Sequence, residues 1–224
     1  MITVYGLLGR PSVDLRLAAA SADVVVGGRR HLDRLDVEED RRITLGDLHA
    51  AVDRIAALPE STQVVVVASG DPLYFGVVRT LRASGLRPAV VPAVSSVAAA
   101  FAAVGLPWDD AGVVSVHGRS LEPALDLAKG AAKVAVLTSA EHGIRELAAG
   151  LADLDRWFVL AERLGEADES VRVLTTAQAR VAMPREPNVV LVLSRHPSTD
   201  DDPWPGSVAG PTSGTEHQTP VELP

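Results

Sequence analysis

Four consecutive valines followed by an abrupt turn constrain this chain more than any other feature. Residues 64–76 read VVVVASGDPLYFG. A run of β-branched residues without polar alternation is typical of a strand that is buried on both faces. Gly70 and Pro72 prevent the strand from simply continuing, so the chain is expected to turn there. In a parallel sheet this turn lies at the carboxyl edge, where open α/β sheets bind ligands.

Short apolar runs alternate with helical patterns along most of the chain. The predicted strands cover residues 2–5, 23–26, 64–68, 89–91, 113–116, 134–137, 158–160 and 189–193. The predicted helices cover residues 15–22, 48–58, 77–84, 97–104, 124–129 and 144–151. This alternation is typical of crossover units, and it therefore predicts an α/β fold with mainly parallel sheets.

The clearest break in the pattern is the segment GLPWDDAG at residues 105–112. Its glycines and proline stop the preceding helix, which predicts an N-terminal α/β domain at 1–110 and a C-terminal α/β domain at 111–196. The same segment also fits a long loop within one domain. Residues 197–224 are rich in Pro, Gly, Ser and Thr, and this composition predicts a disordered tail.

Charge and composition exclude several function classes. A formal net charge of -8 and an aromatic content of 4% argue against nucleic-acid binding. The absence of cysteine excludes disulfides and thiolate chemistry, and the six histidines show no metal-ligand spacing, so we expect no metal site. We expect no membrane span and a cytoplasmic location, because no apolar run reaches about 18 residues and no signal-like segment opens the chain.

Two glycine-containing turns follow predicted strands and suit either ligand binding or a purely local role. Gly6 and Gly9 lie in GLLGRP, which lacks the third glycine of a dinucleotide-binding fingerprint. Gly70 can expose backbone amides and Asp71 can accept hydrogen bonds, although both residue types also favour ordinary β-turns. The residues alone leave both interpretations open.

Two further strand ends carry polar side chains. Ser95 and Ser96 precede a predicted helix, where a serine can cap the helix, contact a ligand or do both. His117 and Arg119 flank Gly118 after another predicted strand. An imidazole transfers protons near neutral pH and a guanidinium grips carboxylates, but both side chains are also common on plain surfaces.

The segment GGRRH at residues 27–31 is a local positive cluster in an acidic chain. Arg29 and Arg30 suit an anionic substrate, and they equally suit the neutralisation of the acidic residues that follow at 33–40.

Taken in order, these segments resemble the class III tetrapyrrole methyltransferases. Within them, the chain is most similar to the CbiE-type corrin C5-methyltransferases of cobalamin biosynthesis, which act on precorrin-6Y or precorrin-7. The resemblance covers roughly residues 1–194. It rests on the N-terminal glycine turn and the segments VVVGGRRHLDRL, ASGDPLYFG, PAVSSVAAAFAAVGLPWDD, VVSVHGR and AERLG.

The resemblance implies two α/β domains of the tetrapyrrole methylase fold, usually in a homodimer, with S-adenosylmethionine in the cleft between them. His117 would be an acid or base and Arg119 a clamp for substrate carboxylates, with Arg29 and Arg30 also facing the substrate. The residues facing the methyl donor would be Gly6, Gly9, Gly70, Asp71, Phe75, Gly76, Ser95, Ser96, Leu137 and Thr138.

The implied reaction is the methylation of C5 of a precorrin. Because only the Pro-rich tail follows, a separate C15-methyltransferase and decarboxylase is the implied partner. The first glycine loop departs from the GxGPG-like pattern usual in the family. Two alternatives therefore stay open: an impaired relative that serves as a binding or assembly subunit, and a methyltransferase of the same fold with a non-corrin substrate.

Overall fold

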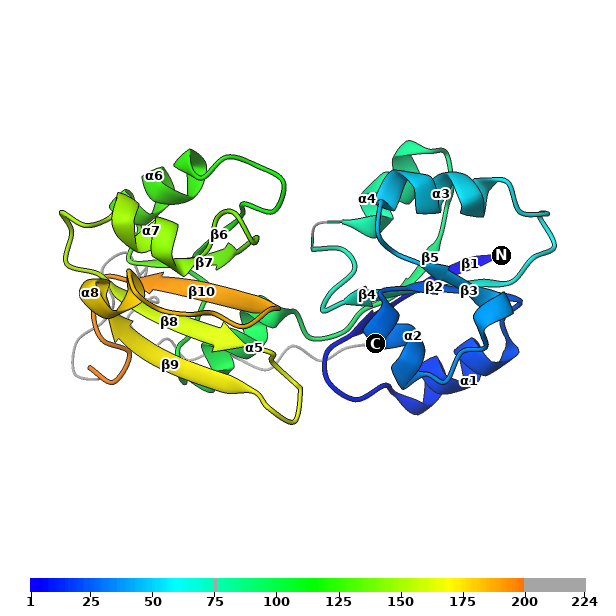
Figure 1. The fold of residues 1–224 in the computed structure, drawn as a ribbon, viewed down its shortest axis with the longest axis horizontal. Coiled ribbons are helices and arrows are strands. Elements are labelled where there is room, and N and C mark those ends of the chain that lie inside the picture. The colour runs from blue at the N-terminus through cyan, green and yellow to red at the C-terminus, as the bar shows by residue number, and fades with distance from the viewer. Residues whose placement is uncertain (75, 200–224) are drawn as a thin grey trace, which may run out of the picture.

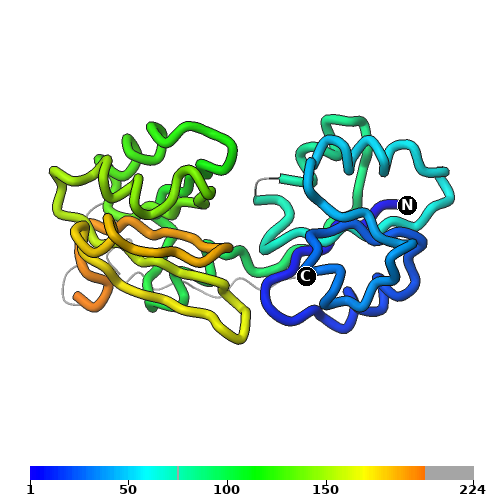
Figure 2. Tube along the Cα trace, viewed as in Figure 1, coloured from blue at the N-terminus to red at the C-terminus, as the bar shows by residue number. Residues whose placement is uncertain are grey.

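The computed structural model describes residues 1–74 and 76–199 of the chain. Figure 1 shows two lobes side by side, each built on one five-stranded sheet with helices packed against it. The chain passes from the first lobe to the second in the segment that follows the fifth strand (Figure 2). The predicted α/β fold class is confirmed.

All pairings in the first sheet are parallel. The four valines at residues 64–67 lie in its middle strand and are all buried, as the sequence predicted. Because every strand runs in the same direction, the loops that follow them meet at one edge. In spatial order the strands are β3 (Arg42–Thr44), β2 (Val24–Gly27), β4 (Val64–Ser69), β1 (Ile2–Leu7) and β5 (Ala89–Val91).

Helices cover both faces of this sheet (Figure 1). One face packs against α1 (Val13–Ser21) and α2 (Arg29–Arg34), and the other against α3 (Leu48–Ala56) and α4 (Val77–Ala83). Side chains cap two of these helices. Ser12 Oγ accepts a hydrogen bond from the Leu15 amide at 3.1 Å, and Asp47 Oδ1 accepts one from the His49 amide at 2.8 Å.

The second sheet is mixed rather than mainly parallel. Only β6 and β7 pair in parallel, and the other three pairings are antiparallel. The physical reason is clearest at residues 163–169, a connection between β8 and β9 that is too short for a parallel crossover. In spatial order the strands are β6 (Gly112–Ser115), β7 (Lys133–Leu137), β10 (Asn188–Leu193), β8 (Trp157–Glu162) and β9 (Ser170–Thr175).

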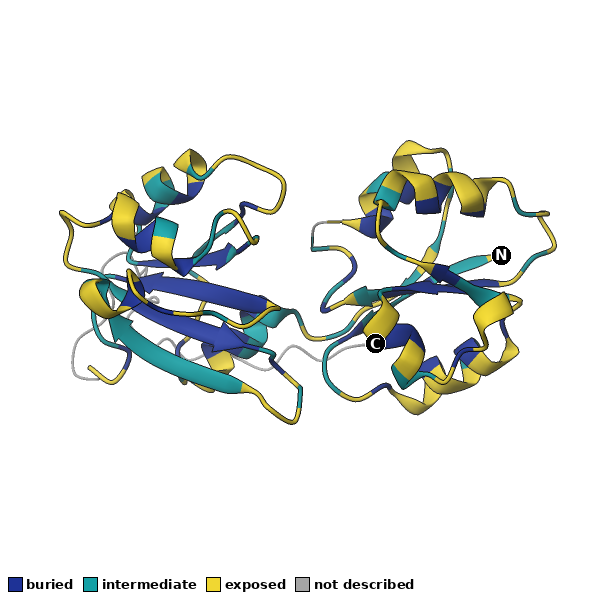
Figure 3. Ribbon diagram, in the orientation of Figure 1, coloured by how far each residue is buried: buried dark blue, intermediate teal, exposed yellow. Residues whose placement is uncertain are grey.

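The second sheet also has two apolar layers. One contains residues of α6 (Glu122–Gly130), α7 (Ile144–Gly150) and α8 (Thr176–Ala179), and the other contains α5 (Ser96–Ala103). Figure 3 shows the result in both lobes: the central strands are buried, and the helices turn exposed faces outward.

The helix α5 lies before the predicted domain boundary at residue 110, but it packs against the second sheet. Val97, Ala100 and Phe101 share an apolar cluster with β8 and β10. The predicted domains, 1–110 and 111–196, stay a prediction, and packing alone places α5 with the second lobe. Of the predicted tail, only residues 197–199 are described, and the remainder lies outside the described residues.

Sequence reasoning also missed several short elements. These are α2, β9, α8, β3 and the 3₁₀ turn at Glu39–Arg41 before it. Their sequences are short, charged or only half-buried, so they carry little of the apolar periodicity on which the predictions relied.

Candidate functional site

A cleft of about 740 Å³ lies between the two lobes, within the range of roughly 300–1,000 Å³ that is typical of small-molecule sites. Its walls come from the carboxyl-edge loops of the first sheet and from strand ends of the second. Most of the predicted site residues line this cleft. They are Gly9, Gly70, Asp71, Gly76, Ser95, Ser96, His117, Arg119, Leu137 and Thr138.

Two predicted residues are placed differently, and a third is not described. Gly6 is not part of the cleft lining, and it packs against the backbone of Gly70 and Ala93 instead. Phe75 lies outside the described residues. Of the two neighbouring arginines, Arg30 lines the cleft, whereas Arg29 is exposed and is not among the lining residues.

The loop at Gly70 and Asp71 is tightly built. Gly70 has a φ of +65°, a conformation that favours glycine, and its amide donates to the Leu7 carbonyl at 2.8 Å. A Cβ atom at this position would lie 3.3 Å from the amide nitrogen of Ser96. One carboxylate oxygen of Asp71 accepts from the Leu73 amide at 2.9 Å. The loop is therefore a preformed wall whose bare backbone permits close approach by a ligand.

Ser95 has the capping role that the sequence suggested, since its Oγ accepts from the Ala98 amide at 3.0 Å. Thr138 is buried, and its Oγ1 lies 3.0 Å from the carbonyl and 2.9 Å from the side-chain oxygen of Asn188. A threonine hydroxyl has one hydrogen to donate, so Asn188 already engages it. Thr138 thus fixes the end of β7 to the start of β10 and shapes the cleft floor.

His117 and Arg119 project from an exposed turn after β6. Gly118, with a φ of +65°, turns the chain between them, and the Arg119 amide donates to the Val116 carbonyl at 3.2 Å. Both side chains line the cleft, opposite the loops of the first sheet. Their position suits contact with a ligand that is already seated against those loops.

A clasp between the lobes, which sequence reasoning missed, closes one side of the cleft. Arg34 on α2 donates to the Gly9 carbonyl at 2.7 Å and forms an ion pair with Glu166 in the β8–β9 connection. Beside it, Gly9 and Gly165 are in backbone contact: a Cβ atom on Gly165 would lie 2.6 Å from the Gly9 nitrogen. No local sequence signal marks Arg34 and Glu166 as partners, because they are far apart in the chain.

His31 is the last residue of the positive cluster at 27–31, and it also lines the cleft. It is buried, and its Nε2 lies 3.4 Å from Ser69 Oγ. Burial, reinforced by the charges of Arg30 and Arg34 and opposed by Glu166, lowers the pKa of His31 to about 4. The imidazole is therefore neutral at pH 7.

We expect this histidine to weaken the fold in acid. Its pKa is about 4 in the folded protein and 6.5 in the unfolded chain, so between pH 6.5 and pH 4 the unfolded chain binds more protons. The free energy of unfolding should lose about 2 kcal/mol between pH 7 and pH 5 from this residue alone. Urea unfolding at both pH values should show a smaller drop for His31→Gln, whereas His49→Gln, at an exposed histidine, should behave like wild type. Equal pH dependence in all three proteins would contradict the assignment.

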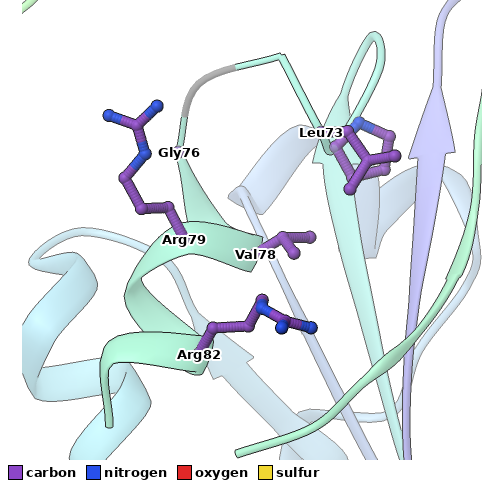
Figure 4. A pocket seen from close by; sticks show the side chains of 6 residues that line it. Leu73, Gly76, Val78, Arg79 and Arg82 are labelled. Atoms are coloured by element: carbon purple, nitrogen blue, oxygen red, sulfur yellow. The ribbon is translucent and has the colours of Figure 1, made fainter.

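A smaller hollow of about 290 Å³ lies beside α4 (Figure 4). Arg79 and Arg82 project from the helix there, with Leu73 on the opposite wall. We place the functional site in the larger cleft, because it is there that loops from both sheets bring polar groups together.

Among residues 1–74 and 76–199, no group of three or more histidine, cysteine or acidic side chains is arranged to hold a metal ion. In the same part of the chain, every helix is too short or too polar to cross a bilayer. The expectation of a metal-free protein stays a prediction.

With the cleft and its loops described, comparison with known proteins defines the class. The chain belongs to the tetrapyrrole (corrin/porphyrin) methylases, because the model of that family matches residues 13–180.

Two methyltransferases are similar to the chain over most of its length. The chain is 32% identical to the cobalt-precorrin-7 C(5)-methyltransferase of Salmonella typhimurium, over 86% of this chain and 98% of that protein. It is 36% identical to a decarboxylating precorrin-6Y C(5,15)-methyltransferase of a Sinorhizobium species, over 77% of this chain but only 43% of that longer protein.

A solved structure shares the fold. The uroporphyrin-III C-methyltransferase of Thermus thermophilus, complexed with S-adenosyl homocysteine, superposes with a TM-score of 0.62. The two are 23% identical, and the alignment covers 85% of this chain and 97% of that one. The predicted family and the two-lobed fold are thereby confirmed.

Proposed function

We propose that this protein methylates C5 of a precorrin-type macrocycle with S-adenosylmethionine as methyl donor, in cobalamin biosynthesis. The single observation that carries the proposal is its similarity, along 86% of its length, to a cobalt-precorrin-7 C(5)-methyltransferase. The relative that also acts at C15 is matched over less than half of its length. On the pattern of the relative that is named for C5 alone, a separate enzyme for C15 methylation and decarboxylation is part of the proposal.

The residues of the cleft fit the methyl donor. Bare backbone at Gly70 leaves room for close approach, and the lining includes the carboxylates of Asp71 and Glu186, which suit a cationic sulfonium. No phosphate-binding loop occurs in the chain, as suits a donor without phosphate. Support also comes from the related fold that was solved with S-adenosyl homocysteine.

When bound, the donor supplies an electrophilic methyl group to a nucleophilic carbon of the macrocycle. The work of the protein is then mainly alignment, which in well-oriented systems contributes on the order of 7–11 kcal/mol. The loops at Gly70 and Ser95 hold the donor, while the turn with His117 and Arg119 faces the substrate. Arg119 would grip a substrate carboxylate, and His117 would exchange a proton with the macrocycle.

The assembly and location of the protein also belong to this proposal. We infer a homodimer in the cytoplasm, on the pattern that the family resemblance implies. Sedimentation of the purified chain tests the oligomeric state directly.

Calorimetric titration with S-adenosylhomocysteine tests the cofactor site. Asp71→Ala should weaken binding about tenfold or more, because it removes a carboxylate from the cleft wall. Gly70→Val should abolish measurable binding, since a branched side chain there is strained at a φ of +65° and crowds Ser96.

Gly85→Val is the matched control for backbone strain. Gly85 also has a positive φ, +83°, but a Cβ atom there meets nothing within 4 Å, and the residue is not in the cleft lining. This variant should lose stability and keep its affinity for S-adenosylhomocysteine. Full affinity in both Asp71→Ala and Gly70→Val would show that the cofactor does not bind at the Gly70–Asp71 loop.

A further inference from the structure

Arg30 is an incompletely neutralised cation on the first-lobe wall of the cleft. Its side chain is 39% exposed, and its Nη2 donates to Ser69 Oγ at 3.1 Å. The nearest carboxylate, Glu166, is 4.0 Å away and is already paired with Arg34. Two guanidinium groups thus share one carboxylate, which leaves one excess positive charge facing the cleft.

The environment of Arg30 makes an anionic ligand favourable there. Burial lowers the pKa of Arg30, against the opposing effect of Glu166, which shows that the charged group is partly desolvated. A partly desolvated cation gains more from an opposite charge than a fully hydrated one. His31 adds no competing charge, because burial and the neighbouring arginines keep it neutral.

Ser69 is arranged to donate a hydrogen bond into the cleft. Its Oγ accepts from Arg30 and contacts His31 Nε2 at 3.4 Å. The other ring nitrogen, Nδ1, is buried and has no hydrogen-bond partner in the described part of the chain, so we assign the imidazole hydrogen to Nε2. Both lone pairs of Oγ then accept hydrogen bonds, and its own hydrogen is left to donate to a ligand in the cleft that Ser69 lines.

The position of Arg30 separates it from the proposed donor site. The loops assigned to the donor follow β4, β1 and β5, which are neighbours in the sheet. Arg30 instead follows β2, on the other side of β4. An anion bound by Arg30 therefore lies beside the proposed donor site, on the β2 side of β4.

We propose that Arg30 and Ser69 form a subsite for one carboxylate side chain of the tetrapyrrole substrate. The inference rests on the proposed function and deepens it, because it names the group by which the macrocycle is oriented. Arg30 binds the carboxylate by charge and hydrogen bonding, and Ser69 donates a second hydrogen bond beside it. Glu166 and Arg34 hold the Arg30 side chain at the clasp between the lobes.

Equilibrium binding of two corrins to the full chain tests the subsite without any turnover. Cobyrinic acid carries carboxylate side chains, whereas cobinamide carries carboxamides in their place. Wild-type protein should bind the acid more tightly. Arg30→Gln should weaken acid binding about tenfold or more and leave cobinamide binding unchanged. Ser69→Ala should weaken acid binding about threefold.

Arg29→Gln is the matched control, because it removes the same charge one residue away and outside the cleft lining. It should change acid binding less than twofold. Equal losses in Arg29→Gln and Arg30→Gln would overturn the subsite in favour of a general field effect. Wild-type protein that binds the two corrins equally, or fails to bind the acid, would overturn it as well.

The carboxylate that Arg30 binds could belong to the tetrapyrrole or to the methyl donor. Titration with S-adenosylhomocysteine distinguishes these two sources. Arg30→Gln should bind this ligand within twofold of wild type; a tenfold loss would assign Arg30 to the carboxylate of the methyl donor and overturn the proposal. Methyl transfer to a C5 substrate tests the proposed function separately. Protein that binds cobyrinic acid through Arg30 but transfers no methyl group would refute that function and leave the subsite standing.

Discussion

Replacing Lys133 with methionine is expected to cost about 3–5 kcal/mol of unfolding free energy, the usual loss when one member of a buried ion pair is removed. The Lys133 side chain is only 3% exposed. Its Nζ forms an ion pair with Asp110 and donates to the Pro107 carbonyl at 2.8 Å. The change leaves a carboxylate that is 14% exposed, and a backbone carbonyl, without that partner.

Thermal and urea unfolding measure this effect. A loss of this size lowers the melting temperature by roughly 10 °C in a chain of this length. Lys129→Met is the matched control, because Lys129 forms an exposed ion pair with Asp126 and should cost less than about 0.5 kcal/mol. The double variant Lys133→Met with Asp110→Leu should recover part of the loss, because two apolar side chains leave no unpaired charge in the interior. If Lys133→Met alone were as stable as wild type, the ion pair of Lys133 with Asp110 would not stabilise the loop.

The same ion pair is a contact of residues 105–112 that the sequence did not reveal. The glycines and proline of this segment predicted a break after the helix, and Gly105, Pro107 and Trp108 are indeed exposed. In the structure the loop is fastened to the second sheet by Lys133, and Trp108 stacks on Phe101 with ring centroids 6.2 Å apart. A lysine that begins a strand carries no local sign that its side chain will be buried. Such a contact is set by the fold and not by nearby residues.

Other parts of the fold were predictable because their signals are local. The valines at 64–67 are buried, and Ser95 caps α5 as its position before a helix suggested. In the second sheet, β9 escaped prediction because its residues are all half-buried and include Arg172. The antiparallel pairings there depend on loop lengths and on partners distant in sequence, which apolar runs do not specify.

In the cleft, too, features with local signals were predictable and contacts between distant residues were not. The turns at Gly70, Ser95 and His117 were found because each follows an apolar strand, and strand ends converge in a parallel sheet. The clasp of Arg34 with Glu166 was not found, because it joins segments that only the packing of the two lobes brings together. Loop positions were thus predictable, while the contacts between the lobes were not.

Replacing Gly6 with alanine is expected to reduce both stability and affinity for S-adenosylhomocysteine. A Cβ atom at Gly6 would lie 2.4 Å from the Gly70 carbonyl oxygen and 2.7 Å from the Ala93 nitrogen. Both contacts are with backbone, so relief requires β1 and two cleft loops to separate. Overpacking of this kind typically costs 1–3 kcal/mol, and we expect about 3 kcal/mol here because no flexible side chain can yield.

Affinity should fall together with stability, because the displaced atoms belong to the proposed cofactor loop. Gly70 is tied to β1 through the Leu7 carbonyl, so movement at Gly6 shifts the wall that faces the ligand. We expect about tenfold weaker binding by calorimetry. Gly46→Ala is the control, since a Cβ atom at Gly46 meets nothing within 4 Å and should change stability by less than about 0.5 kcal/mol.

The two measurements together decide what Gly6 does. The sequence suggested that it faces the cofactor, whereas the structure places it behind Gly70, outside the cleft lining. A packing role predicts that Gly6→Ala loses stability in the absence of ligand and loses affinity as a consequence. A direct contact predicts lower affinity with unchanged stability. Because the clash is with backbone on two sides, we expect Gly6→Ala to lose both stability and affinity. The cleft wall then depends on a glycine that no ligand touches.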